Sequence, residues 1–363
     1  MTIYLVNIFI TILLGVYVHN SYNEEERNQR NKVLCIVCSF CWVILSGFRD
    51  LSIGPDTVAY KNIFDNIKFT DFSTLWENLF SKFGSVSNLL EGNVNNKDPG
   101  YYILTKALQL FLPTYRLYLI FVAVFFMALL GRFLYKNTRS PYLGFIMFDC
   151  LFYSFYAITG IRQTLATALI VFLGYEFIKE RKLVPFAIVS LVAFFIHKSS
   201  ICFVMFYYFS QIKVKKRIIA IWAALIVFAF YYRNVIMVFL GSFVGYEQYA
   251  RQYGSSSPTT FTVLILGLLL VCAILHERIA EYDGEFQNKF NALCWTAAFL
   301  PLAYIDPSAM RISYYYALFV MLVLDDITVI FSERSKFYYK ALLTIMMMIL
   351  LILNNPQYKF CFL

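Results

Sequence analysis

The stretch LYLIFVAVFFMALLGRFLY, residues 117–135, decides the fold class of this chain. Arg132 is its only charged residue, and the run is close to the roughly 20 apolar residues that a helix needs to cross a bilayer. The composition of the whole chain agrees with this interpretation. Of the 363 residues, 60% are hydrophobic and 15% are charged, whereas about a quarter of the residues in a soluble domain are charged. Most of the surface is therefore expected to face lipid.

Other segments of similar length and apolar character bring the number of candidate spans to about twelve. They lie near residues 3–19, 33–48, 117–135, 141–158, 161–178, 183–197, 199–212, 218–235, 259–276, 290–305, 312–331 and 340–354. The first is predicted to be a span and not a signal peptide, because it has no basic leading region and no small-residue cleavage site. The sequence thus predicts an all-α polytopic integral membrane protein of about twelve transmembrane helices, with residues 1–363 as a single transmembrane domain.

The basic residues predict which loops face the cytoplasm. Lys and Arg cluster in six short loops, at 23–32, 135–139, 179–182, 213–217, 276–289 and 332–340. These loops hold 17 of the 31 basic residues and fall on one side of a twelve-helix topology with both termini outside. The formal net charge of +9 therefore indicates membrane orientation, and no nucleic-acid partner is expected.

Residues 49–116 form one long loop on the outer side. Two segments in it, 56–67 and 72–83, have apolar residues at helical spacing and predict amphipathic helices at the membrane surface. A polar stretch at 84–98 connects them to residues 99–113, which are expected to form another helix with an apolar face. The loop is therefore expected to be folded and not disordered.

The cysteines do not predict a metal site. Cys35, Cys38 and Cys41 have helical spacing, but no further ligands accompany them. They are expected to be small side chains buried in the bundle or facing lipid, and no metal or cofactor is predicted.

Four ionisable residues fall at the outer ends of predicted spans. Arg49 ends the second span, Arg162 begins the fifth, His197 ends the sixth and Arg311 begins the eleventh. An ionisable group at membrane depth is costly, so each marks a candidate functional position. Because guanidinium groups bind phosphate oxygens in pairs, three arginines at one leaflet predict an anionic ligand such as a lipid-linked pyrophosphate. His197 is the one histidine expected on that side and is the candidate general base.

A less specific interpretation stays open for these positions. An arginine at a helix end also serves as a snorkelling anchor, and a histidine there as an interfacial residue. Asp56 and Asp306 precede good helix starts and would act as N-caps. An aromatic belt at the headgroup level would account for Tyr60, Tyr101, Tyr102 and residues 314–316.

Five segments form an ordered set of motifs. They are FRDLSIGPDTVAY (48–60), DPGYYILTKAL (98–108), GIRQTLATALIVFLGYEFIKERK (160–182), LVAFFIHKSSICFVMFYYF (191–209) and MRISYYY (310–316). The first resembles an "Arg, then Ile-Gly, Asp-Thr and Tyr" motif, and the second the acidic-x-Gly-Tyr element that follows it. The next two resemble an Arg-Gln helix, a basic loop and a helix that ends in His-x-Ser. Together, over residues 45–320, they resemble the EpsG family, Wzy-type polymerases of bacterial surface polysaccharides.

The resemblance implies an enzyme of the bacterial cytoplasmic membrane with its site on the outer face. Such enzymes take an oligosaccharide repeat unit on undecaprenyl diphosphate and transfer the growing glycan from its lipid carrier onto the next lipid-linked unit. The product is an O-antigen, a capsule or an exopolysaccharide, and neither a metal nor a cofactor is needed. The resemblance also implies an architecture similar to that of C-type membrane glycosyltransferases, with membrane lipids and a chain-length regulator protein as partners.

The same resemblance gives roles to individual residues. Arg162 and Arg311, with Arg49 as a third, would neutralise the diphosphate. His197 would take the proton from the acceptor hydroxyl, and Asp56 would either orient that histidine or act as the base itself. The residues expected to bind the glycan are Tyr60, Asp98, Tyr102, Gln163 and Tyr315.

Three other classes of protein fit part of this pattern. An O-antigen ligase uses the same donor and shares the outer Arg and His residues, but the order of the motifs favours the polymerase. A flippase or other transporter would show repeated halves and polar residues near the bilayer midplane, which the sequence does not show. An acyltransferase would show a cluster of polar residues at the inner face, and none is apparent.

Overall fold

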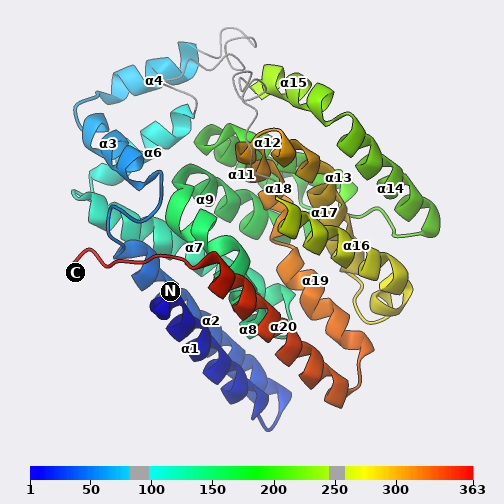
Figure 1. The fold of residues 1–363 in the computed structure, drawn as a ribbon. Coiled ribbons are helices and arrows are strands. Elements are labelled where there is room, and N and C mark those ends of the chain that lie inside the picture. Colours follow the sequence, from blue (N-terminus) through cyan, green and yellow to red (C-terminus); the bar gives the residue numbers. More distant parts are fainter. Residues whose placement is uncertain (82–97, 245–257, 363) are drawn as a thin grey trace.

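The computed structural model describes residues 1–81, 98–244 and 258–362, and these residues form helices and loops without a β-strand (Figure 1). In chain order the α-helices are α1 (Thr2–His19), α2 (Glu24–Gly47), α3 (Thr57–Ile67), α4 (Phe72–Ser81), α6 (Pro99–Gln109), α7 (Tyr115–Asn137), α8 (Pro141–Met147), α9 (Ile161–Thr167), α10 (Gly174–Lys179), α11 (Leu183–Ile196), α12 (Ile201–Val204), α13 (Phe206–Phe209), α14 (Lys216–Tyr231), α15 (Arg233–Val244), α16 (Thr259–Ala280), α17 (Phe286–Phe299), α18 (Met310–Ala317), α19 (Val320–Asp326) and α20 (Glu333–Asn354). Three π-helical segments lie between them, at Phe148–Phe152, Ser154–Thr159 and Ala168–Leu173.

Six helices are long and apolar enough to cross a membrane. They are Thr2–His19, Glu24–Gly47, Tyr115–Asn137, Ile161–Lys179, Thr259–Ala280 and Glu333–Asn354. Two bent pairs, Lys216–Tyr231 with Arg233–Phe239 and Pro307–Ala317 with Val320–Ile330, raise the number to eight in the described part of the chain if each pair is one span. The protein is therefore an all-helical, multi-pass membrane protein.

The expected number of twelve spans is not confirmed, because four of the expected segments form shorter helices. Two of them, near 141–158 and 183–197, give apolar helices of only 10–17 residues. The other two, 199–212 and 290–305, break into shorter helical pieces. A spanning helix takes about 20 residues, so the apolar runs in these four places are too short, as continuous helices, to be counted as full spans.

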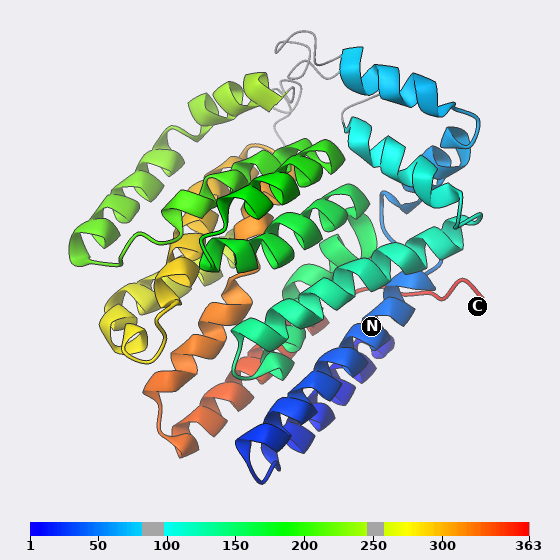
Figure 2. The same ribbon diagram turned by 180° about the vertical axis from the view of Figure 1, so that it is seen from behind.

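The segment 49–116 places three helices, α3, α4 and α6, together at one end of the bundle, here called the α6 end (Figures 1 and 2). The buried residues of α3 are Thr57, Tyr60, Phe64 and Ile67, which recur every three or four positions along one face. The other face of α3 is exposed, so the helix is amphipathic. Of the polar stretch expected at 84–98, residues 84–97 lie outside the described residues.

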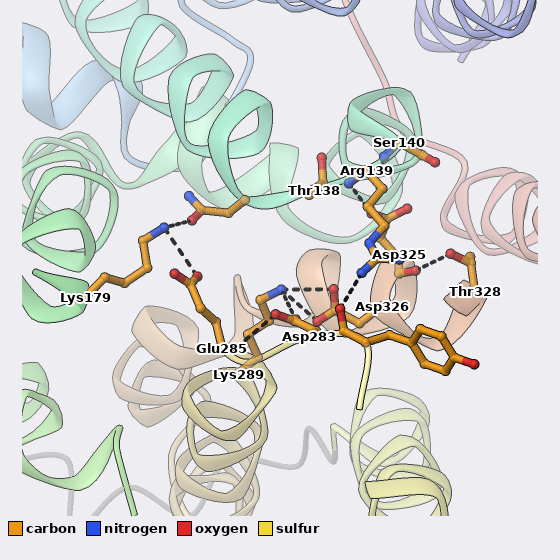
Figure 3. A network of polar contacts seen from close by, with 12 residues as sticks. Thr138, Arg139, Ser140, Lys179, Asp283, Glu285, Lys289, Asp325, Asp326 and Thr328 are labelled. Atoms are coloured by element: carbon orange, nitrogen blue, oxygen red, sulfur yellow. Dashed lines mark hydrogen bonds and ion pairs between the residues drawn. The ribbon is translucent and has the colours of Figure 1, made fainter. Parts of the chain in front are cut away.

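Several of the basic loops meet at the opposite end of the bundle (Figure 3). The ammonium group of Lys179 lies 3.3 Å from the carboxylate of Glu285. Lys340 of α20 donates a hydrogen bond of 2.7 Å to the hydroxyl of Ser140, which follows the basic loop 135–139. These contacts place the loops on one side of the bundle, away from the α6 end.

A buried lysine, Lys289, forms ion pairs with two aspartates at the same end of the bundle. Lys289 lies 2.7 Å from Asp283 and donates a hydrogen bond of 2.9 Å to Asp326, and only 5% of its side chain is exposed (Figure 3). The neighbouring Asp325 accepts hydrogen bonds from the backbone N–H groups of Arg139 and Ser140, at 2.5 and 3.2 Å. One ion pair and one carboxylate thus connect the loops after α7 and α16 to the end of α19.

We predict that Lys289→Ala destabilises the protein strongly, because it leaves the carboxylate of Asp326 buried without its cation. The expected loss in the free energy of unfolding is about 3–5 kcal/mol, the usual range for breaking a buried ion pair. Thermal unfolding of the purified protein in detergent measures it. Lys182→Ala is the matched control, because Lys182 pairs with Glu180 on the surface and an exposed pair contributes up to about 1 kcal/mol. Equal melting temperatures for the two variants would contradict the prediction.

Candidate functional site

A buried carboxylate, that of Asp98, joins three chain segments at the α6 end. Asp98 immediately precedes α6, and 2% of its side chain is exposed. Its Oδ2 accepts a hydrogen bond of 2.8 Å from Nη1 of Arg162 and lies 3.2 Å from Nδ1 of His197. Its Oδ1 accepts the backbone N–H of Lys198 at 3.0 Å. We call these three side chains and the N–H group of Lys198 the Asp98 cluster.

The local sequence explains how α6 approaches α11 closely enough for these bonds. Pro99 stands at the first helical position, where its fixed φ suits a helix and its missing N–H costs nothing. Gly100 lies against Phe195, because a Cβ at position 100 would be 2.6 Å from the Cβ of Phe195. The lack of a side chain at position 100 therefore lets Asp98 reach His197.

Arg162 is the second residue of α9, which follows two π-helical segments, a feature often found at functional sites. Its guanidinium carbon lies 5.8 Å from the ring centre of Tyr60 and 5.9 Å from that of Tyr101. These distances are within the range of cation–π attraction. Nε of Arg162 is buried and has no hydrogen-bond partner among the described residues. Arg162 is thus held by one carboxylate and two aromatic rings, and the N–H group of its Nε has no described partner.

His197 directly follows the last residue of α11, where the backbone becomes extended. Its side chain is 8% exposed, and Nδ1 is the nitrogen that faces Asp98. A proton on Nδ1 is stabilised by the carboxylate, and Nε2 then carries the free lone pair. This arrangement orients an imidazole for work as a general base.

The carboxyl group of Asp98 stays ionised although it is buried. Burial raises its pKa, but the charges and hydrogen bonds of His197, Arg162 and the Lys198 N–H lower it further, to about 2. Because this pKa lies below the ordinary value of 3.8, the stabilisation from these partners is present above that value and is lost only as the pH falls towards 2. The cluster therefore keeps its negative member throughout the neutral range.

A second and more exposed ion pair lies beside the cluster. Nη2 of Arg311 is 3.6 Å from Oδ2 of Asp56, and the two side chains are 43% and 38% exposed. The guanidinium of Arg311 also lies 5.7 Å from the ring centre of Phe155. Gln163, which follows Arg162 in α9, donates a hydrogen bond of 2.6 Å to the carbonyl oxygen of Arg311. This bond joins the two arginine-bearing segments into one site.

The loop before α3 presents Asp56 to Arg311. Gly54 has a φ of 92°, which favours glycine, and a Cβ there would be 2.8 Å from Cγ2 of Ile158. The side chain of Asp56 makes no capping hydrogen bond to α3. The side chain of Asp306, in contrast, does cap, because it accepts the N–H of Ser308 at 2.6 Å. The capping interpretation therefore fits Asp306 and not Asp56.

Arg49 has its own set of contacts, apart from the Asp98 cluster. The side chain is buried, and Nη1 donates to the carbonyl oxygen of Ser46. Its backbone forms an antiparallel bridge with Phe360, and its carbonyl oxygen accepts a hydrogen bond of 2.6 Å from Arg116. The described contacts of Arg49 therefore connect the first motif to the C-terminal segment, and none of them involves the cluster.

The tyrosines expected to bind glycan differ in position. Tyr60 is buried and Tyr102 half-buried, and each packs against Tyr101 with ring centres 5.9 Å apart. Tyr315 is fully buried, and its hydroxyl lies 3.1 Å from the hydroxyl of Ser199. Tyr102 thus presents some surface to a ligand, whereas Tyr315 packs within the protein.

The sequence alone did not reveal two features of this site. It placed Asp98 among glycan-binding residues, whereas the carboxylate that contacts His197 is that of Asp98 and not that of Asp56. It also assigned no site role to Tyr101, whose ring lies beside Arg162. The available signal was the Asp-Pro-Gly sequence at residues 98–100. An acidic residue there comes just before a helix start, and the glycine lets another helix approach closely. In the described ranges, no three His, Cys, Asp or Glu side chains gather in a way that could hold a metal.

The residues of this site suit two chemical tasks, which are proton transfer and the binding of an anion. A carboxylate-oriented imidazole suits abstraction of a proton from a hydroxyl. Two guanidinium groups in the same site suit stabilisation of a negatively charged group that develops or departs during the reaction.

We predict that Gly100→Ala disturbs the packing of α6 against α11, on which the Asp98 cluster depends. The added Cβ would meet both the backbone and Cβ of Phe195, so α6 must move away from α11. Overpacking of this kind costs about 1–3 kcal/mol, and thermal unfolding in detergent should show a lower melting temperature. Gly267→Ala is the control, because a Cβ at that position of α16 meets no atom within 4 Å. A Gly100→Ala variant as stable as this control would contradict the packing argument.

The chain was also compared with known proteins. The model of the EpsG family matches residues 31–362. A search of curated proteins and a search of solved structures found no match. The family match covers all five motifs and every residue of the site described above. The chain therefore belongs to the EpsG family.

Proposed function

We propose that this protein is a polysaccharide polymerase that transfers a glycan from undecaprenyl diphosphate to the next lipid-linked repeat unit. Membership of the EpsG family supports the polymerase class. The six to eight candidate spans among the described residues are compatible with a substrate that a lipid anchors in the membrane. The observation that carries the proposal is the Asp98–His197 pair beside Arg162 and Arg311. The pair provides a general base, and the two arginines provide positive charge for binding an anion.

In the proposed reaction, His197 acts on the acceptor. Nε2 of His197 takes the proton from a hydroxyl at the non-reducing end of the acceptor glycan, and the hydroxyl oxygen bonds to the anomeric carbon of the donor. The bond from that carbon to the diphosphate oxygen breaks, and the bonding electron pair leaves with undecaprenyl diphosphate. Asp98 holds the imidazole and stabilises the imidazolium that forms.

The arginines act on the donor. Charge builds up on the diphosphate as its bond to the sugar breaks, and guanidinium groups fixed beside it lower the energy of that state. Gln163, the neighbour of Arg162, is bonded to the backbone of Arg311, and this bond holds the two arginine-bearing segments together beside the proposed diphosphate position. Tyr60 and Tyr102 are the nearest proposed contacts for the glycan, and Tyr102 is the more accessible of the two.

Complementation of a bacterial strain that lacks its own polymerase tests this proposal. Wild type is expected to restore a ladder of surface glycan on a gel. The variants His197→Ala, Asp98→Asn, Arg162→Ala and Arg311→Ala should leave single repeat units, because each removes a partner of the proposed step. For His197→Ala the expected loss in rate is about 100-fold or more, the usual contribution of a general base.

Two variants at the opposite end of the molecule control for expression and folding. His276→Gln changes a histidine in α16, and Arg132→Ala removes a half-exposed side chain from Glu176, which keeps its second partner Lys136. Both should give the wild-type ladder at equal membrane levels. If well-expressed site variants also gave a full ladder, the assignment of the site would be wrong, even with the family correct.

A second test concerns the side of the membrane that the site faces, which we propose to be the outer one. Cys361 is exposed, and its N–H donates a hydrogen bond of 2.9 Å to the carbonyl oxygen of Phe48, next to the first motif. The remaining cysteines are buried or partly buried. A membrane-impermeant maleimide should therefore label intact cells through Cys361, and Cys361→Ser should remove the label. Labelling only after the membrane is permeabilised would place the site on the cytoplasmic side.

A further inference from the structure

The two arginines of the site differ in how firmly they are held. Arg162 makes a 2.8 Å hydrogen bond to a carboxylate that is 2% exposed. Arg311 lies 3.6 Å from Asp56, beyond a normal hydrogen bond, and both side chains are more than one third exposed. The first pair is therefore fixed within the protein, whereas the second pair is loose and in contact with solvent.

The backbone of Arg311 is nevertheless fixed. Its carbonyl oxygen accepts the 2.6 Å bond from Gln163, and its guanidinium lies over the ring of Phe155. Only the far end of the side chain is thus available to change partner. An exposed ion pair contributes little to stability, so an anion of higher charge than a carboxylate can replace Asp56 at small cost.

Asp56 is equally available to separate from Arg311. It stands before α3, but its side chain makes no hydrogen bond to the start of that helix. Apart from the contact with Arg311, no hydrogen bond or ion pair is described for the carboxylate of Asp56. Asp56 can therefore leave the guanidinium without breaking any other described bond.

We propose that Asp56 and the diphosphate of the lipid-linked substrate compete for one guanidinium, that of Arg311. This inference rests on the proposed function, and it divides the work between the two arginines. Arg311 binds the diphosphate when it enters and exchanges it for Asp56 when it leaves. Arg162 stays bound to Asp98 and positions His197, so it acts mainly on the chemical step.

Binding of inorganic pyrophosphate and of undecaprenyl diphosphate to the purified protein in detergent tests the competition. Asp56→Asn removes the competing charge but keeps the size of the side chain. It should tighten the binding of both ligands by about two- to tenfold, because it releases an exposed ion pair and removes a repulsive charge. Arg311→Gln should weaken both by at least about tenfold, as expected for loss of a charge-assisted bond. Arg162→Gln should change binding by less than about threefold while the rate of glycan transfer falls.

A double variant makes the test specific to the pair. If Asp56 acts through Arg311, the gain from Asp56→Asn should disappear in a protein that also carries Arg311→Gln. The competition is ruled out if Asp56→Asn binds pyrophosphate no more tightly than wild type, or if the gain persists without Arg311. Melting temperatures within a few degrees of wild type confirm that the variants are folded.

The outcome also separates this inference from the proposed function. If wild type makes a glycan ladder but Asp56→Asn does not tighten ligand binding, the polymerase function stands and the proposed competition is wrong. A protein that shows the predicted binding pattern but makes no ladder keeps an anion site in which Arg311 and Asp56 compete, and the polymerase function is then wrong.

Discussion

The arrangement of the α6 end depends on one buried charge, the carboxylate of Asp98. A carboxylate without partners in such a place would cost several kcal/mol, so its presence requires donors at fixed positions. These donors come from the start of α9 and from the residues that follow α11, segments far from Asp98 in the sequence. Satisfying a single charge therefore brings three helix ends to the same point, and the imidazole and guanidinium groups acquire fixed positions as a consequence.

Buried charges are paired differently at the two ends of the bundle. At the basic-loop end, Lys289 is enclosed between Asp283 and Asp326, and the pairing is closed on itself. At the α6 end, the Asp98 cluster has an unused N–H donor on Arg162 and adjoins the exposed Arg311. The first arrangement connects loops and encloses its one cation between two carboxylates. The second leaves the buried Nε of Arg162 without a described partner and the guanidinium of Arg311 partly exposed, which is why it is the candidate site.

The sequence predicted the long spans and the convergence of Arg162 and Arg311 on one site, because both follow from apolar run length and from helix ends that face the same side. Its twelve spans are not confirmed, since hydropathy does not detect where a helix stops, as in the segments after Ile196 and Phe299. It also gave Arg49 and Arg162 equivalent roles, although one packs against the C-terminal segment and the other against Asp98. Which helix end contacts which is a property of tertiary packing, and no local pattern encodes it.

The backbone pairing between Arg49 and Phe360 has a consequence for the order in which the protein matures. The first motif loop, near residue 50, is synthesised before α7, but two of its backbone partners, at Lys359 and Cys361, are synthesised only after α20. The loop therefore cannot adopt its final form until the C-terminal segment has arrived on the same side of the membrane. A partly inserted chain would carry Arg162 and His197 but hold the loop that bears Asp56 less firmly. The position of the loop that carries Asp56 is thus coupled to the placement of α20 and of the segment that follows it.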